Sequence, residues 1–272
     1  MAPYPVDVMM TVAMAREVRP GDWVSHGAAV PLAGAALYLA IETHAPDVEF
    51  WIQGCVSPTN RNLADALIEP ERILPTAPAH MSQTEIINFE LRGNGLFQFL
   101  RPLQIDPYGN INASLVERPD GTQLRFHGVA VGDALNIVRR VCLYVTEHSP
   151  RVFTEQLRYR TATGHHVGSD WRPAHGIKPS GPESVVTPMA VLDFDSSRRL
   201  QIRSVHPGFT VDEVQDATGF DLGVPAHVDH TPEPTATELA ALERVDPDQI
   251  RLLEFRETRS AVLQRLAARQ PA

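Results

Sequence analysis

Residues 23–52 read WVSHGAAVPLAGAALYLAIETHAPDVEFWI and carry the clearest folding signals in the chain. Residues 23–26 and 48–52 are short apolar runs typical of strands. Between them, Gly27 to Pro31 favours a turn, and the alanine- and leucine-rich residues 32–44 favour a helix. Strand, turn, helix and strand in this order form one βαβ unit. The unit predicts a parallel sheet whose ligands bind beyond the carboxyl ends of its strands.

The rest of the chain carries further strand and helix signals around this unit. Strands are predicted within residues 95–105, at 141–146 and twice within 188–205, and helices at 8–15, 235–245 and 248–268. We therefore predict an α/β protein with an open, mostly parallel sheet and a helical C-terminal tail. Residues 1–222 are expected to form this domain, and residues 223–272 a linker and helices that pack on the domain or on a partner.

Composition excludes several classes of protein. The 272 residues carry 24 basic and 33 acidic side chains, a net charge of −9, which disfavours nucleic-acid binding. The longest apolar stretch, residues 30–41, is shorter than the roughly 20 residues that cross a bilayer, so no membrane span is expected. The N-terminus lacks the pattern of a secretion signal, and two cysteines are too few for a disulfide framework. A cytoplasmic protein is expected.

Residues 103–112, LQIDPYGNIN, form the most distinctive motif. They predict a strand, a tight turn and a second strand, with Asp106, Asn110 and Asn112 near the strand ends. Two interpretations stay open: these side chains line a site, or they satisfy the backbone of the turn. Phosphate-loop, dinucleotide and nucleophile-elbow motifs are absent from the sequence.

The run QIDPYGNINAS at 104–114 resembles the signature of the beta subunits of glutaconate CoA-transferase and its relatives, the family I CoA-transferases. Further segments agree with the beta-subunit pattern in the same order along the chain: AMAREVRPGD at 13–22, VPL at 30–32, APD at 45–47, VHPGFT at 205–210 and DATGF at 216–220. The resemblance extends over residues 9–247, and the shared order of the segments makes it specific.

The resemblance implies the open α/β fold of the CoA-transferase, or NagB/RpiA-like, type. It also implies an alpha subunit of similar fold, in a heterodimer or heterotetramer, with the active site between the subunits. The substrate would be an acyl-CoA thioester, and no metal is expected. In the transferases, a beta-subunit glutamate at the end of the second strand attacks the thioester, and the resulting anhydride exchanges with CoA to give a glutamyl-CoA thioester.

The chain departs from the family at the position of this glutamate. Aligned from Pro46-Asp47, the position is occupied by Gln53, whose neutral carboxamide cannot run the anhydride cycle. Glycine-rich family patterns are also altered, to RPLQ at 101–104, to GVAV at 128–131 and to Ala29 in the first loop. Side chains at these positions would crowd a ligand that approaches the backbone.

Three interpretations of Gln53 remain open. Its amide donates to a developing oxyanion in an enzyme without a covalent intermediate, as the resemblance to the steroid ring-opening hydrolases of actinobacteria implies. It is a relic in a structural beta subunit. Or the alignment is shifted, although Glu49 is the only carboxylate nearby. Cys55 with His26 as its base is a further candidate nucleophile, and an inert buried thiol is the alternative.

The predicted site follows from this resemblance. The predicted catalytic residues are Gln53, Asp106, Asn110 and Asn112. The predicted substrate- and CoA-binding residues are Gly27, Ala29, Pro31, Gly54, Arg101, Gln104 and Gly128. Arg101 could pair with a CoA phosphate or form an exposed salt bridge. His165-His166 is interpreted as part of a solvated loop rather than a metal site.

The sequence thus predicts the beta subunit of a heteromeric enzyme that acts on an acyl-CoA thioester, atypical because of Gln53. A ring-opening C–C bond hydrolase subunit and a non-catalytic subunit that supports its partner are the alternatives.

Overall fold

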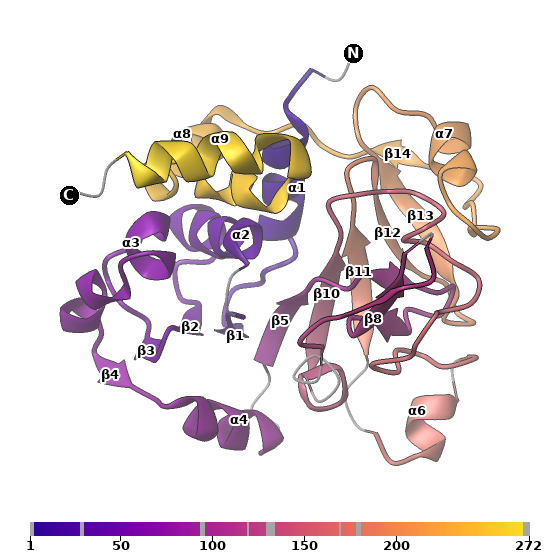
Figure 1. The fold of residues 1–272 in the computed structure, drawn as a ribbon, viewed down its shortest axis with the longest axis horizontal. Helices are drawn as coiled ribbons and strands as arrows, with labels where there is room; N and C mark the ends of the chain where they lie inside the picture. Colours follow the sequence, from indigo (N-terminus) through magenta and orange to yellow (C-terminus); the bar gives the residue numbers. More distant parts are fainter. Residues whose placement is uncertain are drawn as a thin grey trace. The chain divides into compact units, whose positions relative to one another are not determined.

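The computed structural model describes residues 3–27, 30–92, 96–118, 120–128, 134–168, 170–177 and 181–268 (Figure 1). The chain divides into two compact units. The terminal unit comprises Pro5–Phe89 and the segment from Pro234 onward, and the middle unit comprises Glu90–Glu233 together with the described residues before Pro5. Each unit is an assembly of strands and helices.

The terminal unit contains the predicted βαβ unit. Its elements up to the middle unit are α1 (Val6–Ala15), β1 (Trp23–Ser25), α2 (Pro31–Thr43), β2 (Glu49–Ile52), β3 (Cys55–Val56), α3 (Leu63–Leu67), η1 (Pro70–Arg72), η2 (Leu74–Thr76), β4 (Ala79–His80) and α4 (Gln83–Leu91). The C-terminal elements are α8 (Ala236–Val245), η3 (Ile250–Glu254) and α9 (Arg256–Ala267). The strand order is β1-β2-β3-β4, with β1 and β2 parallel and the other two pairs antiparallel.

Helix α2 is the core of the terminal unit. Residues 31–41 are all buried, as expected for a helix that is apolar on every side. Pro31 occupies its first turn, where the missing N–H of proline has no cost. The N–H of Leu32, in the first turn, has no acceptor within the helix and donates to the Glu254 carboxylate of η3 at 2.8 Å.

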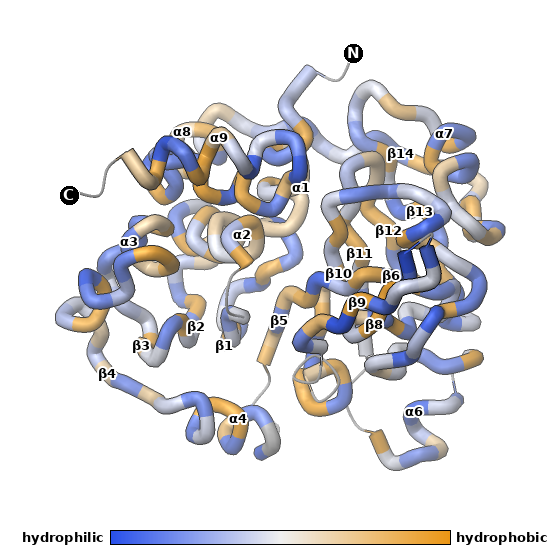
Figure 2. The backbone as a smooth tube through the Cα atoms, in the orientation of Figure 1, coloured by the Kyte–Doolittle hydropathy of each residue, from blue (hydrophilic) through white to orange (hydrophobic). Residues whose placement is uncertain are grey.

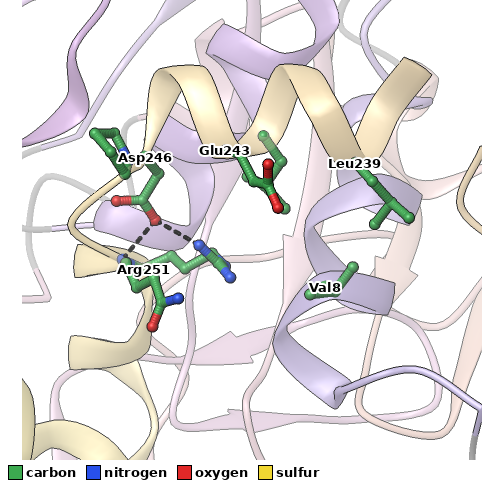
Figure 3. A pocket seen from close by; sticks show the side chains of 8 residues that line it. Val8, Leu239, Glu243, Asp246 and Arg251 are labelled. Carbon is green, nitrogen blue, oxygen red and sulfur yellow. Dashed lines mark hydrogen bonds and ion pairs between the residues drawn. The ribbon is translucent and has the colours of Figure 1, made fainter. Parts of the chain in front are cut away.

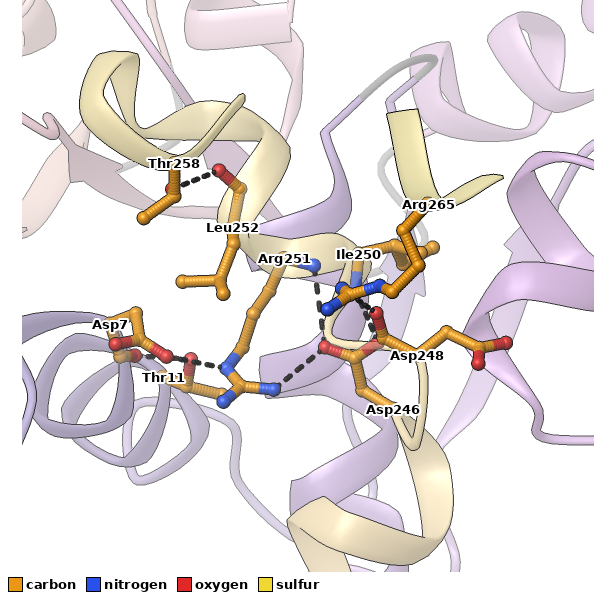
Figure 4. Close-up of polar contacts among 9 residues, drawn as sticks. All are labelled: Asp7, Thr11, Asp246, Asp248, Ile250, Arg251, Leu252, Thr258 and Arg265. Atoms are coloured by element: carbon orange, nitrogen blue, oxygen red, sulfur yellow. Dashed lines mark hydrogen bonds and ion pairs between the residues drawn. The ribbon is translucent and has the colours of Figure 1, made fainter. Parts of the chain in front are cut away.

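The C-terminal helices are fixed to α1 and α2. Helix α8 begins with a capping box between Thr235 and Glu238. The Glu238 carboxylate also forms an ion pair, at 2.8 Å, with the guanidinium of Arg16, the residue that follows α1. Arg251 of η3 donates to Asp7 of α1 and to the buried Asp246, at 2.8 and 2.9 Å (Figure 4). These contacts attach the C-terminal helices to the first helix of the chain.

The middle unit contains the remaining strands. They are β5 (Leu96–Leu100), β6 (Gln104–Ile105), β7 (Ile111–Asn112), β8 (Leu115–Glu117), β9 (Gln123–Arg125), β10 (Arg140–Tyr144), β11 (Pro182–Val186), β12 (Ala190–Phe194), β13 (Leu200–Val205) and β14 (Asp229–His230), with helices α6 (Trp171–Ala174) and α7 (Val211–Asp216). The main strand order is β14-β13-β12-β11-β10-β5, while β6-β7 and β8-β9 form separate two-stranded sheets. Strand β10 lies parallel to both β5 and β11.

The core of the middle unit lies on its parallel strands. All five residues of β10 are buried, and Figure 2 shows hydrophobic residues along β5. Such continuous apolar strands are typical of parallel sheets that are covered on both faces. The chain turns from β11 into the antiparallel hairpin of β12 and β13.

The predicted α/β class is confirmed, and so are the βαβ unit and the helical C-terminal segment. The strand predicted within 95–105 is interrupted, because β5 ends at Leu100 and β6 begins at Gln104, on either side of Pro102. Proline lacks the N–H that a continuous strand needs. None of the helices in the described ranges has the length and hydropathy that a membrane span requires.

Candidate functional site

Gln53 lies at the turn of the β2–β3 hairpin. Its φ is 49° and that of Gly54 is 84°, while Ile52 and Cys55 are paired on either side. Two successive residues with positive φ form the tight two-residue turn that fits the twist of a hairpin. The Gln53 side chain is exposed. Within the described part of the chain, neither its carboxamide nor the backbone N–H groups of Gln53 and Gly54 make a hydrogen bond.

The hairpin concentrates backbone strain. Gln53 and Ser57, with φ of 49° and 41°, both adopt the left-handed conformation that non-glycine residues avoid. Ser57 is held by two bonds to Phe50, since its N–H donates at 2.8 Å and its hydroxyl accepts at 3.1 Å. Left-handed non-glycine residues cost about 1–3 kcal/mol each and cluster at functional sites.

The loop after β1 begins beside this hairpin. The N–H of His26 donates to Trp51 of β2 at 2.9 Å, so Gly27 follows the strand directly next to β2, and Pro31 opens α2. Ala29 lies outside the described residues. Burial lowers the pKa of His26 to about 4, and its Nε2 atom is buried without a hydrogen bond.

The geometry does not support a Cys55–His26 pair. Cys55 is fully buried, burial raises the pKa of its thiol, and the described contacts include no hydrogen bond between the two side chains. A protonated thiol is a weak nucleophile. The alternative, an inert buried cysteine, fits this arrangement.

The signature turn at 106–110 is closed by its own side chains. The Asp106 carboxylate accepts from the backbone N–H groups of Tyr108 and Asn110, at 2.9 and 3.0 Å, and from Asn110 Nδ2 at 2.7 Å. Burial raises the pKa of Asp106, while these three hydrogen bonds and the charge of Arg160 act in the opposite direction. Asp106 is thus a buried carboxylate stabilised by backbone and amide donors.

Asn110 connects the signature turn to a distant loop. Its Oδ1 accepts from the N–H groups of Gly164 and His166, both at 3.0 Å, and its Nδ2 donates to the His166 carbonyl at 2.9 Å. These bonds hold His166 at a φ of 59°. Gly164 has no room for a side chain, because a Cβ would clash with the Gly109 carbonyl oxygen, 2.2 Å away.

Asn112 and Gln104 are bonded to each other. Asn112 Nδ2 donates to Gln104 Oε1 at 2.8 Å and to the Leu115 carbonyl at 2.6 Å. Its Oδ1 accepts from the N–H groups of Ser114 and Leu115. The hydrogen-bonding capacity of Asn112 is therefore used within the fold.

The two remaining binding candidates are Arg101 and Gly128. The Arg101 guanidinium donates to the Thr146 hydroxyl at 3.0 Å. A Cβ at Gly128 would lie 2.4 Å from Ser114 Oγ, so glycine is needed there for packing. Residues 129–131 of the altered glycine pattern lie outside the described residues.

The predicted site residues fall into two groups. Gly27, Pro31, Gln53 and Gly54 belong to the terminal unit. Arg101, Gln104, Asp106, Asn110, Asn112 and Gly128 belong to the middle unit. In the first group, the Gln53 carboxamide and the N–H groups of Gln53 and Gly54 make no hydrogen bond within the described chain, whereas the side chains of Asn110 and Asn112 in the second group are hydrogen-bonded to other residues.

The sequence motifs do not point to the residues that surround Asp106. A cavity of about 340 Å³ is lined by Asp106, Glu155, Gln156, Leu157 and Arg160. His165 is buried, with Nε2 donating to the Pro182 carbonyl at 3.0 Å, and His166 stacks on Trp171 with ring centroids 4.8 Å apart. The sequence signal that could have found them was the concentration of arginine and histidine in 158–175.

A second cavity, of about 430 Å³, lies between α1 and α8 in the terminal unit (Figure 3). Val8 and Leu239 contribute apolar walls, and the Asp246–Arg251 pair closes one end. None of the predicted site residues lines it. The described ranges contain no group of three His, Cys, Asp or Glu side chains that could hold a metal ion.

Comparison with known proteins finds relatives over most of the chain, although no family model matches it. The chain is 27% identical to the B subunit of 3-oxoadipate CoA-transferase from Pseudomonas knackmussii, over 90% of the chain and 95% of the relative. It is 28% identical to the B subunit of glutaconate CoA-transferase from Acidaminococcus fermentans, over 89% and 92%. It is 29% identical to the cholesterol ring-cleaving hydrolase IpdB subunit of Rhodococcus jostii, over 54% and 58%.

Solved structures agree with this similarity. Glutaconate coenzyme A-transferase of A. fermentans matches with a TM-score of 0.80 and 23% identity, over 91% of this chain and 97% of that one. The decarboxylase AibA/AibB matches with a TM-score of 0.78 and 22% identity, over 92% and 98%. The predicted CoA-transferase type of α/β fold is thereby confirmed. In sequence, the chain is similar to the B subunits of CoA-transferases, and it shares their fold.

Proposed function

We propose that the chain is the beta subunit of a heteromeric enzyme that acts on an acyl-CoA thioester without a covalent enzyme intermediate. One observation carries this proposal: Gln53 presents an exposed carboxamide at the hairpin turn, where the family resemblance implies a nucleophilic glutamate. An alpha subunit of similar fold would complete the site, in keeping with relatives that are themselves named as subunits.

The chemistry available at this turn is hydrogen-bond donation. The Gln53 carboxamide and the N–H groups of Gln53 and Gly54 have no bonds within the described chain, so all of them can donate to an oxygen that develops negative charge. Such donors stabilise an oxyanion and polarise a thioester carbonyl. They cannot attack it, so the general acid or base would come from the alpha subunit.

The similarity to the IpdB hydrolase subunit and to AibA/AibB favours a second candidate, cleavage of a C–C bond in a CoA ester. These relatives are a hydrolase and a decarboxylase, so similarity to this family is compatible with reactions other than CoA transfer. A third candidate, a structural subunit, draws support from the internal bonding of Asn110 and Asn112.

The test is mass analysis of the full chain, co-expressed with its alpha subunit and incubated with a panel of acyl-CoAs before hydroxylamine or borohydride trapping. We expect substrate turnover with no modified residue in the wild-type chain. Gln53→Glu should give a trappable glutamyl adduct, whereas Gln264→Glu, at an exposed position on α9, should not.

Three outcomes would contradict the proposal in different ways. A covalent adduct on the wild-type chain would exclude the non-covalent mechanism. Unchanged turnover in Gln53→Ala would favour the structural role. Failure of the wild-type complex to bind any acyl-CoA would remove the substrate class.

A further inference from the structure

The cavity beside the signature turn has a fixed frame. The segment that lines it, residues 155–160, is anchored at both ends to the β6–β7 hairpin. The N–H of Thr154 donates to the Ile105 carbonyl at 3.0 Å, and that of Thr161 donates to the Ile111 carbonyl at 2.8 Å. Asp106 follows β6 directly and is fixed by three hydrogen bonds. These bonds fix the backbone that carries the lining residues, of which Glu155, Gln156 and Arg160 are exposed.

Arg160 differs from the arginines around it. Arg151 and Arg158 form ion pairs with Glu147 and Glu117. Arg160 lines the cavity, and no carboxylate of the described chain lies within 4 Å of its guanidinium. A guanidinium offers five N–H donors, and the exposed Arg160 makes no hydrogen bond within the described chain, so its donors are available to a ligand.

The same cavity also contains acceptors. A carboxylate offers about four acceptor positions, of which Asp106 uses three for its turn. Glu155 lies 4.0 Å from Arg199, beyond hydrogen-bonding distance. One acceptor position on Asp106 and those on Glu155 therefore remain available to a ligand.

Charge decides which kind of ligand fits. Asp106 and Glu155 balance Arg160 and the neighbouring Arg199, so the cluster is neutral before anything binds. A phosphate or carboxylate would add uncompensated negative charge next to two carboxylates, which is unfavourable. A neutral group with both an acceptor and a donor can accept from Arg160 and donate to Asp106 or Glu155 without adding charge. At about 340 Å³, the cavity also has roughly ten times the volume of one water molecule.

We propose that this cavity binds an amide-bearing arm of a ligand. The amide carbonyl accepts from the Arg160 guanidinium, and the amide N–H donates to the Asp106 or Glu155 carboxylate. The assignment of the arm rests on the proposed function: in a CoA ester, the group with this chemistry is pantetheine, which carries two amides. Leu157 supplies an apolar contact for the methylene groups between them.

The test uses calorimetric titration with CoA, pantetheine and adenosine 3′,5′-bisphosphate, and compares variants of the full chain in complex with the alpha subunit. Arg160→Leu should weaken binding of CoA and of pantetheine about tenfold, the expected cost of losing a hydrogen bond to a charged donor. Binding of adenosine 3′,5′-bisphosphate, which has no pantetheine arm, should not change. Arg160→Lys, which keeps one charged donor, should lie between the wild type and Arg160→Leu.

Arg158→Leu is the matched control, because Arg158 lies two residues away and is paired with Glu117. It should leave all three affinities unchanged. Weaker binding of adenosine 3′,5′-bisphosphate in Arg160→Leu, with pantetheine unaffected, would show a phosphate site and overturn the proposal. Unchanged CoA binding in Arg160→Leu would also overturn it while leaving the proposed function intact. A wild-type complex that binds no CoA would remove both.

Discussion

At the scale of single residues, Gln53 has a left-handed backbone conformation that its side chain disfavours. Its φ of 49° is better adopted by asparagine or glycine, yet the position carries a longer amide that is exposed to solvent. Non-glycine residues in this conformation cluster at functional sites, which supports the proposed use of the Gln53 side chain. The sequence predicted the importance of Gln53 by alignment, but not its conformation, because no local pattern marks the residue before Gly54 as left-handed.

Gln53→Asn separates these two properties. Asn-Gly is the preferred pair in this type of hairpin turn, so we expect the free energy of unfolding to rise by about 0.5–1 kcal/mol. The side chain is one methylene shorter, so turnover of an acyl-CoA by the complex should fall. Urea unfolding and steady-state kinetics measure the two effects. Equal turnover in both proteins would show that the reach of the Gln53 amide is irrelevant to catalysis.

The candidate site shows how far residue types can be read from sequence. The signature motif draws attention to Asp106, Asn110 and Asn112, and its sequence is compatible with both a site and a self-satisfied turn. The structure shows that their amides and carboxylate satisfy turn backbone and hold the loop at 164–166. The proposed role of Arg160 depends on the lack of a carboxylate within 4 Å in the described chain, which is a property of the fold and not of the local sequence.

At the scale of elements, the sequence predicts helix boundaries where interactions between neighbouring residues set them. Helix α8 was expected at 235–245 and occupies Ala236–Val245, because the Thr235–Glu238 capping box marks its start. The helix expected at 248–268 is divided into η3 and α9. The division accompanies bonds from the Asp246 side chain to the N–H groups of Ile250 and Arg251, which helical periodicity does not reveal. Likewise, residues 158–184, whose glycines, histidines and prolines favour a long loop, contain α6 and the start of β11.

The attachment of η3 to α1 depends on Arg251. Its guanidinium bonds to Asp7 and to Asp246, which is 1% exposed (Figure 4). Arg251→Met would leave Asp246 as a buried charge without its counter-ion, so the free energy of unfolding should fall by about 3–5 kcal/mol. Chemical denaturation measures this loss.

Two further variants control that prediction. Arg72→Met breaks an exposed ion pair with Asp65 and should cost less than about 1 kcal/mol. Adding Asp246→Asn to Arg251→Met should restore part of the lost stability, since it removes the unpaired charge. An equal loss of unfolding free energy in Arg72→Met and Arg251→Met would mean that the buried ion pairs of Arg251 stabilise the fold no more than an exposed one.

At the scale of the whole molecule, the fold buries histidines in a neutral form. Burial lowers the pKa to about 4 at His26, His148, His165 and His206. Both ring nitrogens of His148 contact threonine hydroxyls: Nδ1 lies 2.9 Å from Thr187 Oγ1, and Nε2 lies 3.0 Å from Thr218 Oγ1. The Thr218 hydroxyl donates to the Val214 carbonyl, so it accepts from His148 Nε2.

These histidines predict a loss of stability between pH 6.5 and about 4. In this window the unfolded chain binds protons that the folded chain excludes, so the free energy of unfolding decreases as the pH falls. Each histidine contributes about 1.4 kcal/mol per pH unit at most, and the four together up to about 5 kcal/mol per unit. Buried Asp106 and Asp246, whose pKa values are raised by burial, offset part of this loss by binding protons in the folded state. Because proteins of this size are stable by about 5–15 kcal/mol, we expect acid-induced unfolding within the window.

Urea unfolding at half-unit steps from pH 7.5 to 4.5 measures this loss directly. The slope of the free energy of unfolding against pH counts the protons that the unfolded chain binds in excess, so His148→Gln should flatten it by about one proton. A free energy of unfolding that stays constant from pH 7 to 5 would contradict the prediction. It would show that these rings are protonated in the fold, or that the fold opens to admit water around them.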